Sequence, residues 1–302
     1  MKEKNMKRIS YVGGLLILAL ALVPANLPFY LYVRGLVKRG EGEVLAAFSA
    51  TRDLSALPLG LGGRFFYTFF PFMLLTAILF LLWRLLHGKK PLSLITSSER
   101  FRFGLFKKGF GLWFLLSFAS DLIQFILHRE NYRFNFEPLA WLWLLILGAI
   151  FLIPQVLLEE TFFRAYLIKG GTLFTGKPII PLLLFSLIFG LLHMANPEVE
   201  EYGALIMMPQ YIGMGLFLAF LCWETDGLEL SLGIHLANNS WGLLFVNSGG
   251  TAFETPAPFT LIEWNPLASL IYLTMAMALF LTLYYREKPS LKGKKSFFYN
   301  DY

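Results

Sequence analysis

Charged residues are scarce in this sequence. Only 15% of its 302 residues are Asp, Glu, Lys or Arg, whereas 56% are hydrophobic, and soluble domains carry about a quarter charged residues. Long polar stretches are lacking too, so no soluble domain of ordinary size fits between the apolar runs. The chain has one cysteine, Cys222, which excludes an internal disulfide. Because this cysteine lies in an apolar run, its position also argues against redox chemistry. These absences indicate one membrane domain spanning residues 1–302.

Apolar runs near the roughly 20 residues that cross a bilayer recur along the whole chain. The expected fold class is therefore all-α, a polytopic integral membrane protein with about eight transmembrane helices. The expected spans are 10–33, 64–86, 104–127, 138–158, 178–195, 204–222, 230–247 and 264–285.

The first apolar run has some features of a signal peptide, because a basic start, MKEKNMKRIS, precedes it. The run nevertheless continues past Pro24 and Pro28 through PFYLYV, and VPA is a poor cleavage site. We therefore expect a retained first helix that the two prolines interrupt.

The distribution of Lys and Arg predicts the orientation of the chain. With a cytoplasmic N-terminus, 18 of the 26 basic residues fall in cytoplasmic segments and 7 on the opposite side. Both termini are therefore expected to be cytoplasmic, in the cell inner membrane if the protein is bacterial. The net charge of +6 fits basic loops beside anionic lipid. No basic stripe alternates with stacking aromatics, so the lipid bilayer and not nucleic acid is the expected partner.

The stretch LLEETFFRAYL, residues 157–167, places three charges inside an apolar run. A charge at the centre of a membrane helix costs about 2.5–3.5 kcal/mol on insertion scales, so such residues are paired or functional. On an α-helix, Glu160 and Arg164 share one face, whereas Glu159 lies about 140° from Arg164. Glu160 is thus expected to pair with Arg164, leaving Glu159 to meet another helix. The alternative is a helix end whose charges extend into the lipid headgroups.

Two histidines, His193 and His235, also interrupt apolar runs. A lone histidine in such a run is usually a hydrogen-bonded core residue, but two of them beside an unpaired glutamate indicate a site. Asn239 follows His235 by one helical turn and shares its face. Gly190 and Gly233 lie near these histidines and would allow neighbouring helices to approach closely.

Carboxylate and imidazole groups suit the activation of water. Ser186 and Ser240 are conceivable nucleophiles, but serines in membrane helices usually bond to the backbone or lie at helix contacts, and no aspartate pair is present. A carboxylate removed from water is a better base near neutral pH, and each donor to a developing oxyanion is typically worth about 2.7–4 kcal/mol. A glutamate, two histidines and an asparagine would therefore be sufficient to hydrolyse an amide.

Three short motifs carry a resemblance to a known family. EETFFR matches EExxxR, FGLLH (189–193) matches FxxxH, and HLANN (235–239) matches HxxxN, in this order on successive membrane helices. In this the chain resembles the CPBP family of CAAX proteases and bacteriocin-processing enzymes, also called the Abi family, which includes the type II CAAX prenyl endopeptidases. The resemblance covers about 159–240, within an expected catalytic core at about 138–247.

The resemblance implies a role for each motif residue. Glu159 would be the catalytic glutamate and His193 its water-activating partner, while His235 and Asn239 would form the oxyanion hole. Arg164 would support the first motif, and helix geometry leaves Glu160 as its partner. Straight helices would not bring His193 and His235 to the same depth in the membrane. His193 lies about 22 Å into its span at 1.5 Å per residue, whereas His235 lies some 7 residues from the cytoplasmic end of its span. Either 178–185 lies partly outside the hydrocarbon or the helices are tilted.

A zinc site is an alternative use of the same residues. Glu159, His193 and His235 would form a His₂Glu set of the kind found in zinc proteases, and the family is often labelled a metalloprotease family. No HExxH pair is present, and asparagine is a poor zinc ligand. We therefore favour glutamate catalysis without a metal or other cofactor.

The sequence thus predicts an intramembrane protease that cuts membrane-embedded or lipid-anchored peptides nearer the cytoplasmic side, and the resemblance to CAAX proteases implies C-terminal CAAX-type ones among them. One alternative is a membrane scaffold or bacteriocin-immunity protein without catalysis, which would function with Glu159 neutralised. A proton-coupled transporter is a further alternative, although its polar residues should be spread through the full membrane depth.

Overall fold

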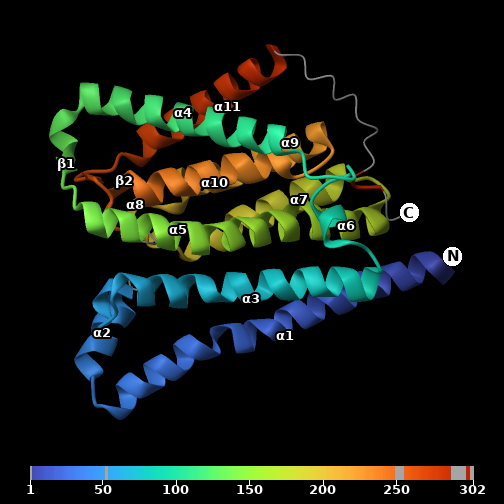
Figure 1. Ribbon diagram of the computed structural model, residues 1–302, viewed down its shortest axis with the longest axis horizontal. Coiled ribbons are helices and arrows are strands. Elements are labelled where there is room, and N and C mark those ends of the chain that lie inside the picture. The colour runs from blue at the N-terminus through green and yellow to red at the C-terminus, as the bar shows by residue number, and fades with distance from the viewer. Residues whose placement is uncertain (1, 52–53, 249–254, 287–296, 300–302) are drawn as a thin grey trace.

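The computed structural model describes residues 2–51, 54–248, 255–286 and 297–299, and it is almost entirely helical (Figure 1). The first half contains α1 (Lys2–Lys38), α2 (Gly42–Thr51), η1 (Leu54–Ala56), α3 (Leu61–His87), η2 (Pro91–Leu94), α4 (Phe103–Leu127), η3 (Arg129–Asn131) and β1 (Tyr132–Phe134). The middle contains α5 (Pro138–Glu159), η4 (Glu160–Leu167), α6 (Ile168–Thr175), α7 (Ile179–Leu191), η5 (Leu192–Ala195) and α8 (Pro197–Tyr202). The last part contains α9 (Ala204–Thr225), α10 (Glu229–Leu244), β2 (Val246–Ser248), β3 (Phe259–Leu261) and α11 (Pro266–Arg286).

The protein is a multi-pass integral membrane protein, as the sequence predicts. Six helices in the described part of the chain are long and apolar enough to cross a bilayer. At the other two expected spans, 178–195 and 230–247, lie the shorter helices α7, of 13 residues, and α10, of 16 residues. The number of membrane crossings therefore stays a prediction.

The basic segments gather at one end of the helices. Figure 1 shows the start of α1, the α3–α4 connection and the α6–α7 connection at the same end. The sheet described below lies at the opposite end. This grouping is what the Lys and Arg distribution predicts, and the assignment of that end to the cytoplasm stays a prediction.

Helices α1 and α3 form an antiparallel pair joined through α2 (Figure 1). Contrary to the expected interruption, α1 is assigned as one helix of 37 residues through both Pro24 and Pro28. Each proline removes one backbone donor, and the helix continues because its other hydrogen bonds and its contact with α3 remain.

Helix α10 is the most enclosed helix and lies against α4, α5 and α9. Glycines allow the close crossing with α4, because a Cβ atom at Gly233 would lie 2.2 Å from the Phe106 carbonyl oxygen. At the α7–α9 crossing, a Cβ atom at Gly190 would lie 2.9 Å from the Ile212 backbone nitrogen. Both close approaches were expected from the sequence and are confirmed.

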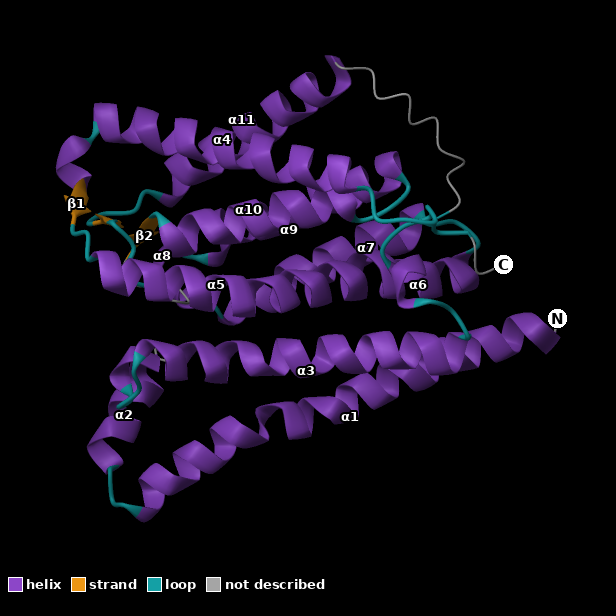
Figure 2. Cartoon of the chain, in the orientation of Figure 1, coloured by secondary structure: helices purple, strands orange, loops and turns teal. Residues whose placement is uncertain are grey.

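A three-stranded sheet that the hydropathy pattern does not predict closes one end of the bundle (Figure 2). Its order is β1-β3-β2, with Tyr132 opposite Leu261 in the antiparallel pair and Val246 opposite Phe259 in the parallel pair. Because each strand has only three residues, long-range pairing and not a periodic pattern determines its position.

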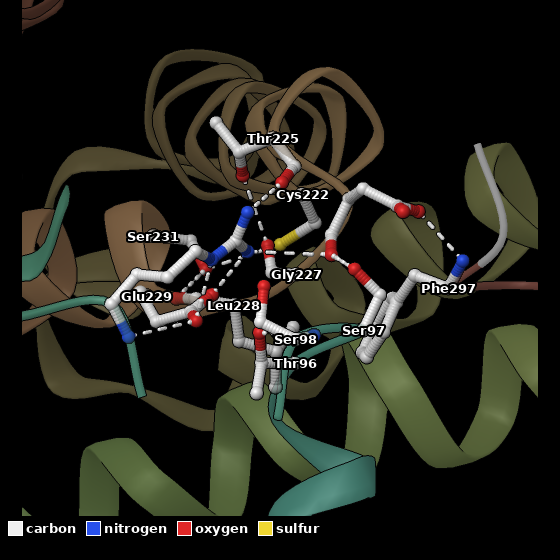
Figure 3. Close-up of polar contacts among 12 residues, drawn as sticks. Thr96, Ser97, Ser98, Cys222, Thr225, Gly227, Leu228, Glu229, Ser231 and Phe297 are labelled. Atoms are coloured by element: carbon white, nitrogen blue, oxygen red, sulfur yellow. Dashed lines mark hydrogen bonds and ion pairs between the residues drawn. The ribbon is translucent and has the colours of Figure 1, made fainter. Parts of the chain in front are cut away.

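At the opposite end, polar contacts hold the turn between α9 and α10 (Figure 3). The Arg102 guanidinium donates to both oxygens of buried Glu229, at 2.8 and 2.5 Å, and to the Thr225 carbonyl at 2.6 Å. Asp226 accepts the Phe297 backbone N–H at 2.6 Å. These contacts fix the first turn of α10, which carries His235 further along.

The stretch from Pro138 to Thr175 continues well beyond one bilayer thickness. Its 38 residues correspond to about 57 Å at 1.5 Å per residue, against a hydrocarbon core of about 30 Å. Helix α7 begins beside α6, the last part of this stretch, where Gly171 faces Pro181. This arrangement favours the first of the two explanations for the depth of His193, in which the start of α7 lies partly outside the hydrocarbon.

Candidate active site

The segment with the charged residues is a π-helix and not the α-helix assumed from the sequence. Segment η4 covers Glu160–Leu167 and directly continues α5, which ends at Glu159. In a π-helix the backbone bonds run from residue i to i+5, and such turns occur frequently at functional sites. The two neighbouring glutamates therefore lie at the junction between the two helix types.

Glu160 is fully buried and has two partners. Its Oε1 atom lies 3.2 Å from Nη1 of Arg164, so the predicted pairing is confirmed, and 2.7 Å from Nδ1 of His235. The contact with His235 was not expected. Because Glu160 reaches from η4 to α10, this carboxylate connects two helices as well as neutralising a cation.

Arg164 lies almost entirely inside the protein, with a side chain that is 2% exposed. Its guanidinium carbon lies 3.9 Å from the centre of the Phe189 ring, a cation–π contact that gains strength where water is excluded. Among the described residues, its guanidinium nitrogens have no hydrogen-bond partner of good geometry. The charge of Arg164 therefore depends on Glu160 and on the aromatic ring.

Glu159 differs from Glu160 in its surroundings, since its side chain keeps 14% of its surface exposed. Gln155, one turn earlier on α5, donates to Oε1 at 2.8 Å, and Nε2 of His235 lies 3.5 Å from Oε2. The predicted meeting of Glu159 with another helix is thus observed, and the partner is α10. Gln155 was missed, although the i, i+4 spacing that paired Glu160 with Arg164 applies to it equally.

His235 lies between the two glutamates, with Nδ1 toward Glu160 and Nε2 toward Glu159. A protonated ring donates from both nitrogens, whereas a neutral ring donates from one. Asn239 does not bond to His235, but donates to the Gln155 side chain at 3.1 Å. His235 and Asn239 therefore both reach Glu159, the first directly and the second through Gln155.

His193 lies in η5, just after α7, and is half-buried. Its Nδ1 atom lies 2.8 Å from the Phe189 carbonyl oxygen, and its ring stacks on Tyr211 at 4.4 Å between centroids and 19° between planes. A neutral ring that donates from Nδ1 keeps its lone pair on Nε2. The Tyr211 hydroxyl in turn donates to Glu198, and Asn196 donates to the same carboxylate at 3.1 Å.

Glu159 and His193 line one cavity of about 670 Å³. Its remaining wall is almost wholly apolar, and it extends between α1, α3, η4 and α7. The lining side chains are Leu15, Leu18, Ala19, Leu22, Phe72, Leu75, Leu158, Phe162, Phe163, Phe189, Leu192 and Asn196. The volume is within the usual range for a small-molecule pocket. The cavity therefore brings a carboxylate and an imidazole to the wall of an apolar space.

The alternative zinc set of Glu159, His193 and His235 does not fit this arrangement. Both nitrogens of His235 face glutamate oxygens, and Nδ1 of His193 is engaged by a backbone carbonyl. Within the ranges that the structure describes, no group of three or more His, Cys, Asp or Glu side chains is placed to hold a metal ion. We therefore derive no chemical step through a metal, and catalysis without a metal stays a prediction.

Comparisons with known proteins point in one direction. Residues 138–241 match the family model "Type II CAAX prenyl endopeptidase Rce1-like". Over 214 residues the chain is 30% identical to the uncharacterized protein YyaK of Bacillus subtilis (strain 168). The matched region covers 69% of this chain and 71% of YyaK. No solved structure matches the chain.

Proposed function

This chain belongs to the Rce1-like type II CAAX prenyl endopeptidase family, and on that premise we propose that it is an intramembrane endopeptidase that hydrolyses peptide bonds of membrane-associated substrates. The family implies protease activity of the CAAX type. We assign the reaction to Glu159, His193, His235 and Asn239, with Glu160 and Arg164 in support.

One observation carries the proposal. The Glu159 carboxylate is oriented by Gln155 and His235 and lines an apolar cavity whose wall also holds His193. A water molecule at this wall would have a proton acceptor and an imidazole beside it, which suits general base catalysis.

The proposed reaction begins when Glu159 takes a proton from a water molecule whose oxygen attacks the carbonyl carbon of the peptide bond. The lone pair on Nε2 of His193 makes this ring the second acceptor at the site. Asn239 has a second amide hydrogen besides the one that it donates to Gln155, and Nε2 of His235 has only a long contact of 3.5 Å with Glu159, so we assign these two groups to the oxyanion of the tetrahedral intermediate. When the C–N bond breaks, the leaving amine receives the proton that Glu159 took from water.

The shape and chemistry of the cavity suggest the substrate class. An apolar space of about 670 Å³ beside the carboxylate suits an apolar segment or a covalently attached lipid chain. We therefore propose membrane-embedded or lipid-anchored peptides as substrates, cut close to the apolar part.

The test is cleavage by purified protein of paired peptides, with and without a C-terminal prenyl group, followed by mass spectrometry. Glu159→Gln keeps the shape of the side chain but removes the base, so product formation should fall by at least 100-fold, within the usual range for loss of acid–base catalysis. Glu43→Gln, at an exposed position on α2, is the matched control and should cut at the wild-type rate. Substantial turnover by Glu159→Gln would contradict the assignment.

Measurements in cells and in sealed vesicles separate the alternatives. A scaffold or immunity protein would retain its cellular function with Glu159→Gln and would cut none of the peptides. A proton-coupled transporter would show activity that depends on the membrane potential, which detergent-solubilised protein lacks.

A further inference from the structure

A second cavity, of about 580 Å³, lies on the other side of the residues that orient Glu159. It lies between α4, α5, α9, α10 and the sheet, at the end of the bundle opposite the basic segments. Its polar lining includes Asp121, Gln155, Asn196, Glu198, Gln210 and Asn239. We refer to it as the polar cavity, and to the 670 Å³ space beside Glu159 as the apolar cavity.

The two cavities meet at the candidate active site. Asn196 lines both of them. Gln155 lines the polar cavity and donates a hydrogen bond to Glu159, which lines the apolar cavity. A single extended ligand passing Glu159 would therefore meet an almost wholly apolar wall on one side and a wall that also carries carboxylates and amides on the other.

The polar cavity is acidic. Two carboxylates, Asp121 and Glu198, line it, and none of the described residues in its wall is Lys, Arg or His. This contrasts with the Glu160 site, where a buried carboxylate has Arg164 beside it. Within this described lining, no side chain offers a positive charge to either carboxylate.

Glu198 provides an independent sign of a missing partner. The residue is 7% exposed, and its Oε1 atom accepts hydrogen bonds from Tyr211 and Asn196. Its second oxygen, Oε2, is buried without a hydrogen-bond partner in the described structure. Leaving a buried carboxylate oxygen unpaired is costly, and each such oxygen in a native protein calls for an explanation.

Asp121, in the same wall, has hydrogen-bond donors to both of its carboxylate oxygens. It accepts hydrogen bonds from the Trp241 indole, from Tyr132 at 3.4 Å and from Gln124 at 3.3 Å. Burial, and then the charge of Asp121, raise the pKa of Tyr132, which keeps its hydroxyl protonated as a donor. Glu198 is therefore the carboxylate of this wall with an oxygen that no neighbouring residue in the described structure satisfies.

We propose that the polar cavity is a substrate subsite that binds a lysine or arginine side chain through Glu198. The substrate would be a peptide whose apolar part occupies the apolar cavity and whose basic residue, on the other side of the cleaved bond, reaches Glu198. This inference rests on the proposed protease function for its biological meaning, but binding of the cationic side chain does not depend on cleavage.

Binding tests the proposal directly. Fluorescein-labelled peptides with a leucine-rich half and a polar half carry one lysine, moved along the polar half, or glutamine at the same position. They are titrated into the full-length Glu159→Gln protein, so that turnover does not interfere. At one lysine position or more, the Kd should be about 10- to 100-fold lower than for the glutamine peptide, as expected for a charge-assisted hydrogen bond.

Two further variants, each combined with Glu159→Gln, decide which carboxylate is responsible. Adding Glu198→Gln should bring the ratio of the two Kd values close to one. Adding Glu200→Gln, at an exposed position of the same helix, should leave it unchanged. A ratio near one at every lysine position, or a ratio that survives Glu198→Gln, would overturn the proposal. Glu198→Gln that weakens the binding of the lysine and glutamine peptides equally would also overturn the proposal, because Glu198 would then act only by holding Tyr211 against His193.

A measurement on the unchanged chain covers the case in which Glu198→Gln does not fold. A hydrophobic carbodiimide couples a carboxylate to an amine with loss of water, so it should join the bound lysine peptide to Glu198, as mapped by mass spectrometry. Coupling only at other acidic residues would refute the subsite. If lysine is bound at Glu198 but no peptide is cut, the protease proposal fails and the subsite stands.

Discussion

Neutralising Glu160 should destabilise the protein strongly, because this one carboxylate contacts both Arg164 on η4 and His235 on α10. In Glu160→Gln, Arg164 loses its countercharge although its side chain is only 2% exposed, and His235 loses a charged acceptor at 2.7 Å. Breaking a buried pair by removing one partner costs about 3–5 kcal/mol. That is a large part of the roughly 5–15 kcal/mol by which a typical domain is stable.

A matched control shows whether the loss of stability depends on the burial of the ion pair or only on its spacing and length. Glu3 and Lys7 form an ion pair of similar length, 3.0 Å, also spaced i, i+4, but with side chains that are 77% and 35% exposed. Because exposed pairs contribute little, Glu3→Gln should denature with the wild type. The double variant Glu160→Gln/Arg164→Met should recover part of the loss, since replacing both partners removes the uncompensated charge.

The assay is denaturation in detergent, by heat and by added denaturing surfactant, with circular dichroism as the signal. Glu160→Gln should have the lowest midpoint of the four proteins, and the double variant should lie between it and the wild type. Equal midpoints for Glu160→Gln and the wild type would refute the reasoning. A double variant less stable than Glu160→Gln would show that Arg164 is stabilised mainly by other contacts, such as its contact with Phe189.

Three further predictions follow from the described contacts. Asn239→Ala removes the donor to Gln155 and a proposed oxyanion donor, so kcat should fall by about 10²–10³ with little change in KM. Chelators should leave cleavage by the wild-type protein unchanged. If chelation stops hydrolysis and added zinc restores it, the prediction of catalysis without a metal is wrong. Arg102→Met leaves the buried Glu229 without its cation and should lower the free energy of unfolding by about 3–5 kcal/mol, measured as above. Gly233→Val places atoms within the 2.2 Å approach to the Phe106 carbonyl and should cost about 1–3 kcal/mol or more, whereas Gly242→Val, which meets nothing within 4 Å, should cost much less.

Local spacing predicted what depends on one helix. The Glu160–Arg164 pair and the availability of Glu159 to a neighbouring helix came from counting residues per turn, and both are present. The pair survives in the π-helix because residues four apart still lie close together in the wider turns. Gln155 was within reach of the same argument and was missed because an uncharged residue in an apolar run attracted less attention.

Contacts between helices were not predictable in the same way. The Nδ1 contact of His235 with Glu160 depends on how α10 lies against η4, and no spacing within either segment determines it. Likewise, Tyr211 was read as part of an apolar span, yet it stacks on His193 and donates to Glu198. Hydropathy located α7 and α10 but overestimated their lengths, because buried polar residues and turns are hidden within apolar runs.

The π-helix determines how this part of the chain responds to a change in its length. Segment η4 lies within a helical stretch that continues without a break from Pro138 to Thr175, so it works like a one-residue insertion that the helix has absorbed. Deleting one residue, such as Phe162, would allow the segment to close as an α-helix with Glu160 and Arg164 three residues apart, a spacing that still places both side chains on one helix face. The helix that follows would keep its orientation, because the deletion removes the residue that the wider turns accommodate. A single-residue deletion in η4 should therefore be tolerated better than one in the regular part of α5, where it would rotate every following residue by about 100° relative to those before it.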